Sequence, residues 1–161
     1  MRKTVIISIL VSVIVLIGFF VFIKLNQPLE SGTISIGTLE DQQLLMLEIG
    51  NKGFGDIQIK RVLVNDSEEP VDTKIQVSNP LKGFIIPGNF TAKGNTDIKD
   101  VKLLPRTSPS TNLEKVNNGT ATEKDHSYGL TLINRNPIYE VIIYYTYLGL
   151  SFEKKIPIAI N

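Results

Sequence analysis

The sequence contains no cysteine, no tryptophan and only one histidine. Without cysteine the chain can form no disulfide, no thiolate nucleophile, no thiolate metal site and no acylated lipobox cysteine. One histidine alone cannot supply the usual ligand set of a zinc site. An exported domain of this composition therefore has to be stable through its hydrophobic core, and the chain is long enough to build one.

A strong net charge of either sign is also lacking. The 161 residues carry a formal charge of +1. The first 24 residues contain Arg2, Lys3 and Lys24 and no acid, and the rest of the chain has 14 basic and 16 acidic side chains. This balance argues against a nucleic-acid partner, which needs a basic stripe or domain. It also predicts no polybasic patch for anionic lipid beyond the cations at the two ends of the first apolar segment.

That apolar segment is residues 5–23, in which 19 consecutive residues carry no charge. As a helix it would be about 28 Å long, close to the roughly 30 Å hydrocarbon thickness of a bilayer. We therefore predict a transmembrane helix at 5–23, acting as an uncleaved signal anchor, and a tether at 24–32. Because cations precede the run, the positive-inside rule places residues 1–4 in the cytoplasm and the later chain outside, in a single-pass protein of the cell membrane.

Two alternatives to an anchor remain open. A cleaved secretory signal needs a shorter apolar core and a small-x-small cleavage site. The residues directly after the run offer no such site, and the nearest loose candidate is Ser31 with Thr33. A helix buried in the core of a soluble domain is less favoured, because nothing along residues 5–23 is amphipathic.

After residue 32 the apolar residues alternate with polar ones, which is the period of half-buried strands. Turn-forming residues such as Asn, Asp, Gly and Pro separate these segments. Short strands at such intervals are typical of a sandwich or barrel, so we predict an all-β sandwich ectodomain over residues 33–161. The expected strands lie near 33–36, 45–49, 57–64, 71–77, 84–86, 98–104, 128–132, 138–148 and 152–160.

Three details refine this arrangement. Apolar residues change parity within 57–64, which indicates a β-bulge. The strand at 138–148 is apolar on both faces, which predicts a central position, and the face of Tyr139, Val141, Ile143, Tyr145 and Tyr147 is the better candidate for the core. The last strand contains Pro157, which cannot donate to a ladder and therefore favours a sheet edge.

Residues 45–53 read Leu-x-Leu-x-Ile-Gly-Asn-Lys-Gly and are followed by a strand, while residues 145–149 read Tyr-x-Tyr-Leu-Gly. The first stretch, extended to residue 70, resembles the B–C region of bacterial membrane-anchored immunoglobulin-like or fibronectin-III-like envelope domains. The second resembles their final hairpin. The resemblance implies an immunoglobulin-like fold on a Gram-positive surface and no active site. The Cys…Trp…Cys signature of true immunoglobulin domains is missing.

Residues 105–127 interrupt the strand pattern. Their only apolar members, prolines aside, are Leu113, Val116 and Ala121. Loops of this length are uncommon unless they are functional or disordered. We expect a long polar loop, either a solvated mobile insertion or a contact loop for a partner.

His126 lies at the end of this polar segment and is the only histidine available as a general base. A hydrolytic triad needs a nucleophile, a base and an orienting acid together in space, and no pattern in the sequence indicates one. We expect an exposed histidine without a catalytic role.

Acidic turns are the remaining candidates for a metal site. Residues 65–69 form one cluster, and Asp97 and Asp100 form another. Neither has the spaced acids and glycine of a calcium loop, and Asn and Asp favour turns for backbone reasons alone. We therefore assign no catalytic, cofactor-binding or metal-binding residue.

Other patterns also have both a functional and a structural interpretation. Gly50, Gly53 and Gly55 do not match a phosphate loop and are expected in tight turns that need a positive φ. Tyrosines could form an interaction surface, but strand propensity and core packing explain them more simply. They lie at positions 139, 144, 145 and 147. Glycosylation sequons, which matter only in a source that glycosylates exported proteins, start at Asn65, Asn89 and Asn118.

These observations favour a non-enzymatic, membrane-anchored protein whose ectodomain binds another protein or supports an envelope assembly. The expected partners are the lipid bilayer, through the helix at 5–23, and a protein. A ligand-sensing or carbohydrate-binding ectodomain is the alternative, with its site on loops at one end of the sandwich. A hydrolase is the least favoured function, because no activated nucleophile is indicated.

Overall fold

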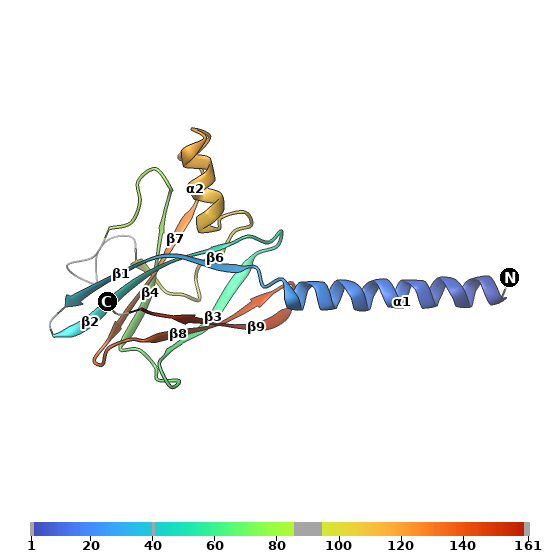
Figure 1. The fold of residues 1–161 in the computed structure, drawn as a ribbon, viewed down its shortest axis with the longest axis horizontal. Helices are drawn as coiled ribbons and strands as arrows, with labels where there is room; N and C mark the ends of the chain where they lie inside the picture. Colours follow the sequence, from blue (N-terminus) through green and yellow to red (C-terminus); the bar gives the residue numbers. More distant parts are fainter. Residues whose placement is uncertain (1, 40, 86–94, 160–161) are drawn as a thin grey trace.

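The computed structural model describes residues 2–39, 41–85 and 95–159, and it contains one long helix joined to a domain built mostly of strands (Figure 1). Helix α1, Arg2–Leu25, projects away from the domain. The domain contains two antiparallel sheets and one short helix, α2, Pro109–Asn117. The predicted organisation, an N-terminal apolar helix followed by a β-rich domain, is confirmed.

The α1 helix is long and apolar enough to cross a membrane over Lys3–Leu25, a span of 23 residues. At a rise of about 1.5 Å per residue the span measures about 34 Å, slightly more than the hydrocarbon layer of a bilayer. Only 6% of its most apolar window is buried. The alternative of a helix buried in the core of a soluble domain is therefore wrong.

The two sheets are both antiparallel throughout. The first has the strand order β1 (Leu29–Leu39), β2 (Gln42–Asn51), β7 (Ser127–Asn134), β4 (Asp72–Ser78) and β5 (Asn95–Thr96). The second has the order β6 (Lys102–Leu103), β3 (Ile57–Val64), β8 (Glu140–Tyr147) and β9 (Leu150–Pro157).

Both sheets contribute to one hydrophobic core, because alternate residues of each strand point to the same side. From the first sheet Leu47 and Leu130 are fully buried, and from the second Ile59, Ile143 and Tyr145. All belong to a single apolar cluster. This shared core is the arrangement expected for two sheets packed face to face.

The details predicted for the strands hold. The register between β3 and β8 shifts between Ile59 and Arg61, which confirms the bulge. Strand β8 lies between β3 and β9, and β9, which contains Pro157, forms an edge. The core face of β8 was predicted correctly except for Tyr139, which precedes the strand and is 50% exposed, because its hydroxyl donates to Asp66 at 2.8 Å.

Three other segments differ from expectation. The helix continues to Leu25 and β1 already begins at Leu29, within the expected tether 24–32, because Leu29 is buried and pairs with Asn51. Of the strand expected at 98–104 only β6 forms. Phe84 and Ile85 are not in a strand, and the third residue of the expected 84–86 strand lies outside the described residues.

The segment 105–127 differs most from its prediction. It contains α2 and is tied to the first sheet by hydrogen bonds, so the expectation of a long loop is wrong. The error has a local cause, since a nine-residue helix with few apolar residues leaves only a faint helical period.

Candidate functional site: a groove beside helix α2

Helix α2 is specified by its two ends rather than by an apolar stripe. Ser108 is the N-cap, where its side chain accepts a hydrogen bond from the Thr111 amide, and Pro109 occupies the first turn. At the other end Gly119 has a φ of 66° and donates to the Val116 carbonyl, while Thr120 donates to the Lys115 carbonyl. This pair of bonds is the Schellman motif that ends helices.

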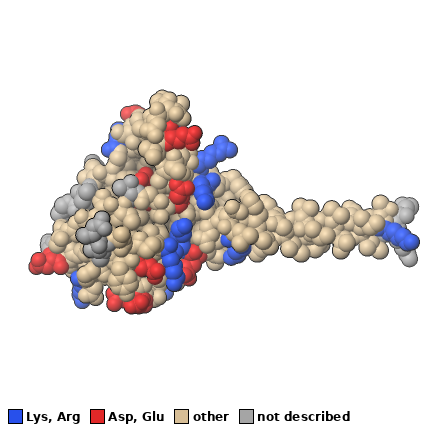
Figure 2. Space-filling model, in the orientation of Figure 1, with Lys and Arg blue, Asp and Glu red and all other residues tan. Residues whose placement is uncertain are grey.

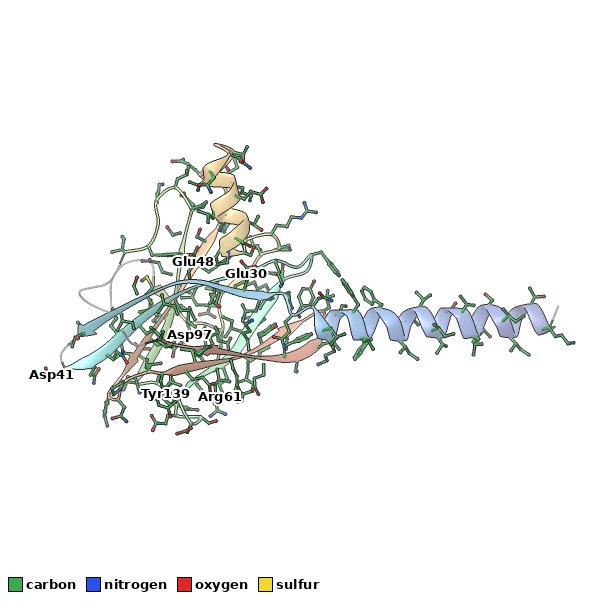
Figure 3. The ribbon with its side chains drawn as sticks, in the orientation of Figure 1. Glu30, Asp41, Glu48, Arg61, Asp97 and Tyr139 are labelled. Atoms are coloured by element: carbon green, nitrogen blue, oxygen red, sulfur yellow. The ribbon has the colours of Figure 1, made fainter. Side chains whose placement is uncertain are left out.

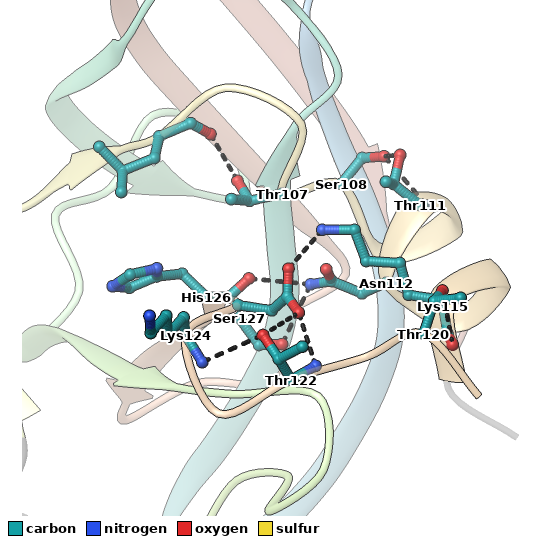
Figure 4. Close-up of polar contacts among 12 residues, drawn as sticks. Thr107, Ser108, Thr111, Asn112, Lys115, Thr120, Thr122, Lys124, His126 and Ser127 are labelled. Carbon is teal, nitrogen blue, oxygen red and sulfur yellow. Dashed lines mark hydrogen bonds and ion pairs between the residues drawn. The ribbon is translucent and has the colours of Figure 1, made fainter. Parts of the chain in front are cut away.

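Two side chains fasten the inner face of α2 to the start of β7 (Figure 4). The Asn112 amide donates to the His126 carbonyl at 2.9 Å and to the Ser127 hydroxyl at 3.1 Å. Lys115 and Asp125 form an ion pair with an N–O distance of 2.5 Å. The position of the helix is therefore fixed by polar contacts on its second and third turns.

Asp125 also closes the turn that follows the helix. Its second carboxylate oxygen accepts from the amide and from the hydroxyl of Thr122 at 2.7 and 2.9 Å. The hydrogen bond from Lys115, followed by those from Thr122, lowers the pKa of Asp125 to about 2.

A second polar cluster is centred on the buried residue Asn51 and lies at the beginning of the segment 105–127. The Asn51 amide donates to the carbonyls of Gly55 and Leu103, and its oxygen accepts from the Gly53 amide. The Asn51 carbonyl accepts from the Thr107 amide at 2.9 Å. One asparagine thus joins three pieces of chain, the turn after β2, the end of β6 and the approach to α2.

Between α2, the first sheet and the loop after β4 lies a groove of about 760 Å³. Its lining is largely apolar, and the carboxylates of Glu30 and Glu48 lie at the foot of α2 (Figure 3). Leu113 and Val116 of α2 face it and are 62% and 41% exposed. The other lining residues are Ser31, Gly32, Pro80, Gly83, Phe84, Pro109, Ser110, Asn112 and Ser127.

The polar groups of the groove are partly committed to the fold. One oxygen of Glu30 accepts from the Ser110 amide at 3.0 Å, which ties β1 to the first turn of α2. Asn112 is 3% exposed, and its carbonyl oxygen has no hydrogen-bond partner among the described residues. The groove can therefore accept apolar groups along its length and a cation near its acidic side.

The structure places His126 directly before β7, beside this region. Its ring stacks on Tyr128 with centroids 6.3 Å apart and an interplanar angle of 17°. Its carbonyl, rather than its imidazole, takes part in the contact with Asn112. The side chain therefore packs against the beginning of β7.

The two acidic clusters are engaged in local contacts. Asp66 accepts from Tyr139, which raises the pKa of that phenol, and Glu69 pairs with Arg61 at 2.7 Å. Asp97 accepts from the Lys99 amide. Among the described residues no three His, Asp or Glu side chains are grouped so that they could hold a metal ion.

Gly50, Gly53 and Gly55 were predicted to have a positive φ, and this prediction is wrong. Among the described glycines, positive φ occurs at Gly83, Gly119 and Gly149, and not at Gly50, Gly53 or Gly55. The glycine at position 50 is needed for space, because a Cβ there would lie 2.1 Å from the Thr107 carbonyl oxygen. The approach of the polar segment to β2 therefore depends on the missing side chain.

The tyrosines and the asparagines of the glycosylation sequons differ in how far they are exposed. Tyr145 and Tyr147 are buried in the core, which agrees with the packing interpretation, whereas Tyr139 is exposed. Asn65 is buried and holds the Tyr139 amide and the Pro137 carbonyl, so its side chain is not available to a modifying enzyme in the folded domain. Asn118 is exposed at the end of α2, and Asn89 lies outside the described residues.

Sequence reasoning missed the groove because its walls come from five separate stretches of the chain. One local signal was present, Ser108-Pro109 followed nine residues later by Asn118-Gly119, which is the pattern of a capped short helix.

Comparison of the chain with family models, with curated proteins and with solved structures found no match in any of the three.

Proposed function

We propose that this protein is a non-enzymatic, membrane-anchored module that binds another protein through the groove beside α2. The observation that carries the proposal is the pair of exposed apolar side chains on α2, Leu113 and Val116, above a largely apolar groove. Polar contacts and the buried Pro109 hold the helix in place, so Leu113 and Val116 are left to face a partner. Clustered exposed apolar residues rimmed by polar ones are typical of interaction sites.

The fold class that we propose for the domain is immunoglobulin-like. In the immunoglobulin constant topology strands A, B, E and D form one sheet and C, F and G the other. Leaving aside the two-residue strands, the order β1-β2-β7-β4 and the order β3-β8-β9 follow the same pattern. On this basis β5, β6 and α2 form an insertion between strands D and E.

The location that we propose follows from α1. Cations at Arg2 and Lys3 favour a cytoplasmic N-terminus, which would put the β-rich domain outside the cell membrane. The resemblance of residues 45–70 and 145–149 to envelope domains supports a bacterial cell envelope.

The chemistry of the groove defines the partner. Carboxylates of Glu30 and Glu48 line one side, and apolar side chains line the rest. A protein segment with two or three apolar side chains and a neighbouring lysine or arginine would match both features. Recognition of this kind resembles the docking of an apolar strip into a surface groove.

A photo-crosslinking experiment in intact membranes tests the proposal. A crosslinking amino acid at position 113 should give one discrete adduct, and the crosslinked partner peptide should contain apolar residues beside a basic one. The same probe at Lys155 on β9, which is exposed on the other sheet, is the matched control. The Val116→Asp substitution should abolish the adduct, and identical adducts from positions 113 and 155 would refute a specific groove.

The volume of the groove favours a second candidate function, a ligand-sensing ectodomain. About 760 Å³ lies within the roughly 300–1,000 Å³ usual for small-molecule sites. A ligand that binds only the folded state would raise its melting temperature. Stabilisation by an apolar metabolite or a glycan that is lost on Leu113→Asp would support this function over protein binding.

A further inference from the structure

A second hollow of about 400 Å³ lies where α1 joins the domain. Phe22, Ile23 and Asn26 of the helix end form one side of it. Lys52, Phe54 and Arg106 of the domain are among the residues on the other side. None of the described lining residues is acidic.

The helix is fixed to the domain at this point. Ile23 is 4% exposed and belongs to the hydrophobic core. The Lys24 ammonium lies 4.5 Å from the centre of the Phe152 ring and donates to the Ser151 carbonyl at 2.9 Å. Asn26 donates from both its amide and its side chain to the Phe22 carbonyl. The same end of the domain must therefore face whatever surface α1 emerges from.

If α1 crosses a bilayer, that surface consists of lipid headgroups. The span Lys3–Leu25 is about as long as the hydrocarbon layer is thick, so its end at Phe22 to Leu25 lies at the boundary between acyl chains and headgroups. The hollow, which begins at Phe22, would then open directly at headgroup depth.

The side chains in the hollow suit a phosphate next to acyl chain. Lys52 and Arg106 are exposed, and within the described part of the chain neither forms an ion pair with a carboxylate. Phe54 is 62% exposed, with its ring edge against Tyr147. Lys and Arg side chains lie at the end of the domain from which the helix emerges (Figure 2). The sequence separates these cations widely, and only the fold brings them to the helix.

We propose that this hollow binds the headgroup phosphate of an anionic phospholipid in the leaflet from which α1 emerges. Arg106 offers the planar donor pair that suits phosphate oxygens, and Lys52 adds a second cation. Phe54 lies among the outer acyl methylenes, beside Phe22. The inference rests on the membrane anchoring in the proposed function, and it assigns the domain a fixed orientation on the bilayer.

Melting of the full-length protein in nanodiscs measures the lipid preference. Replacing part of the phosphatidylcholine by phosphatidylglycerol should raise the melting temperature by about 4–8 °C, since two cations near an anionic surface gain from it. Lys52→Gln with Arg106→Gln should lose most of that rise. The control variant, Arg135→Gln with Lys155→Gln, removes the same charge elsewhere and should keep the rise in melting temperature. Arg135 follows Asn134, and Asn134 pairs with Gln43 at the end of the first sheet that is remote from Leu29.

A fluorescence measurement tests the depth of the site. Because the chain has no tryptophan, Phe54→Trp gives a single tryptophan, which can be excited apart from the tyrosines. Brominated acyl chains should quench this tryptophan and should leave Tyr139→Trp, near the opposite end of β8, unquenched.

Each outcome separates the two proposals. Equal stabilisation of wild type and the Lys52/Arg106 double variant, or an equal rise on adding inorganic phosphate in neutral detergent, would overturn the lipid site and leave the anchor intact. Failure of the full-length protein to insert into nanodiscs at all would overturn the anchor as well.

Discussion

The packed sheets and the polar segment 105–127 form one domain but are held by different forces. Between the sheets the contacts are apolar, with Leu47, Leu130 and Ile143 fully buried. The polar segment is held by hydrogen bonds instead, chiefly those of the Asn112 side chain and of the Asn51 backbone carbonyl, which accepts from the Thr107 amide. The difference explains why exposed apolar side chains remain on α2, since packing them is not what fixes the helix.

The apolar and the hydrogen-bonded contacts also differ in how much stability is lost when a residue is substituted. A buried leucine contributes roughly 1.5–3 kcal/mol through burial alone, whichever neighbour it meets. A hydrogen bond contributes about 1 kcal/mol net, but leaving its buried partner without one costs about 1–3 kcal/mol. The core should therefore lose stability in proportion to the volume removed, and the polar segment in proportion to the partners left unpaired.

The largest effect is expected from Leu47→Ala, which removes a fully buried side chain from the core face of β2. The free energy of unfolding should fall by about 2–5 kcal/mol, because the cavity adds to the lost transfer energy. Urea unfolding in a membrane mimetic, followed by circular dichroism of the β-rich domain, measures it. Ile36→Ala on β1, where the side chain is 45% exposed, is the control, and equal losses in both variants would contradict the assigned core.

The sheets could be predicted because strand periodicity is carried by neighbouring residues. Alternation at 45–49 and 71–77 is enough to place β2 and β4, and the change of parity in β3 is enough to place a bulge. Tyr139 was assigned wrongly because alternation continues past the point where pairing ends. Its polar hydroxyl, and the acidic turn that accepts from it, decide its exposure instead.

The polar segment could not be predicted in the same way. Its structure depends on Asn51, a residue that lies more than 50 positions earlier than Leu103 and Thr107, the partners that it holds. Nothing in the sequence distinguishes this asparagine from a residue of an ordinary turn. The groove and the hollow at α1 were missed for the same reason, since each is made of side chains that only the tertiary fold brings together.

Asn51→Ala should have the next largest effect. The substitution leaves the Gly55 and Leu103 carbonyls and the Gly53 amide without this partner, and should lower the free energy of unfolding by about 1–3 kcal/mol. Hydrogen exchange should also accelerate at the Gly53 amide, which loses its side-chain acceptor. Asn136→Ala, in an exposed turn, is the matched control. Unchanged exchange at Gly53 would show that the Asn51 side chain does not hold this turn.

The smallest effect is the acid response of the polar segment, which follows from Asp125. Its pKa falls from an ordinary 3.8 to about 2 in the folded protein, chiefly through the hydrogen bond from Lys115. A carboxyl whose pKa is lowered by folding stabilises the native state above its unfolded pKa and loses that contribution as pH falls through the folded value. The stabilisation should therefore be complete above about pH 4 and fade toward pH 2.

The comparison with Asp125→Asn isolates this contribution. Above pH 4 wild type should resist unfolding more than the variant, and the difference should shrink as the pH is lowered toward 2, with the amide of Thr122 exchanging faster in step. Glu123→Gln, two residues earlier and exposed, removes a nearby carboxylate without touching the ion pair. If both variants showed the same pH profile as wild type, the Lys115–Asp125 pair would not hold the turn after α2. The segment would then depend on its contacts with Asn51 and Asn112 and on the Glu30–Ser110 hydrogen bond.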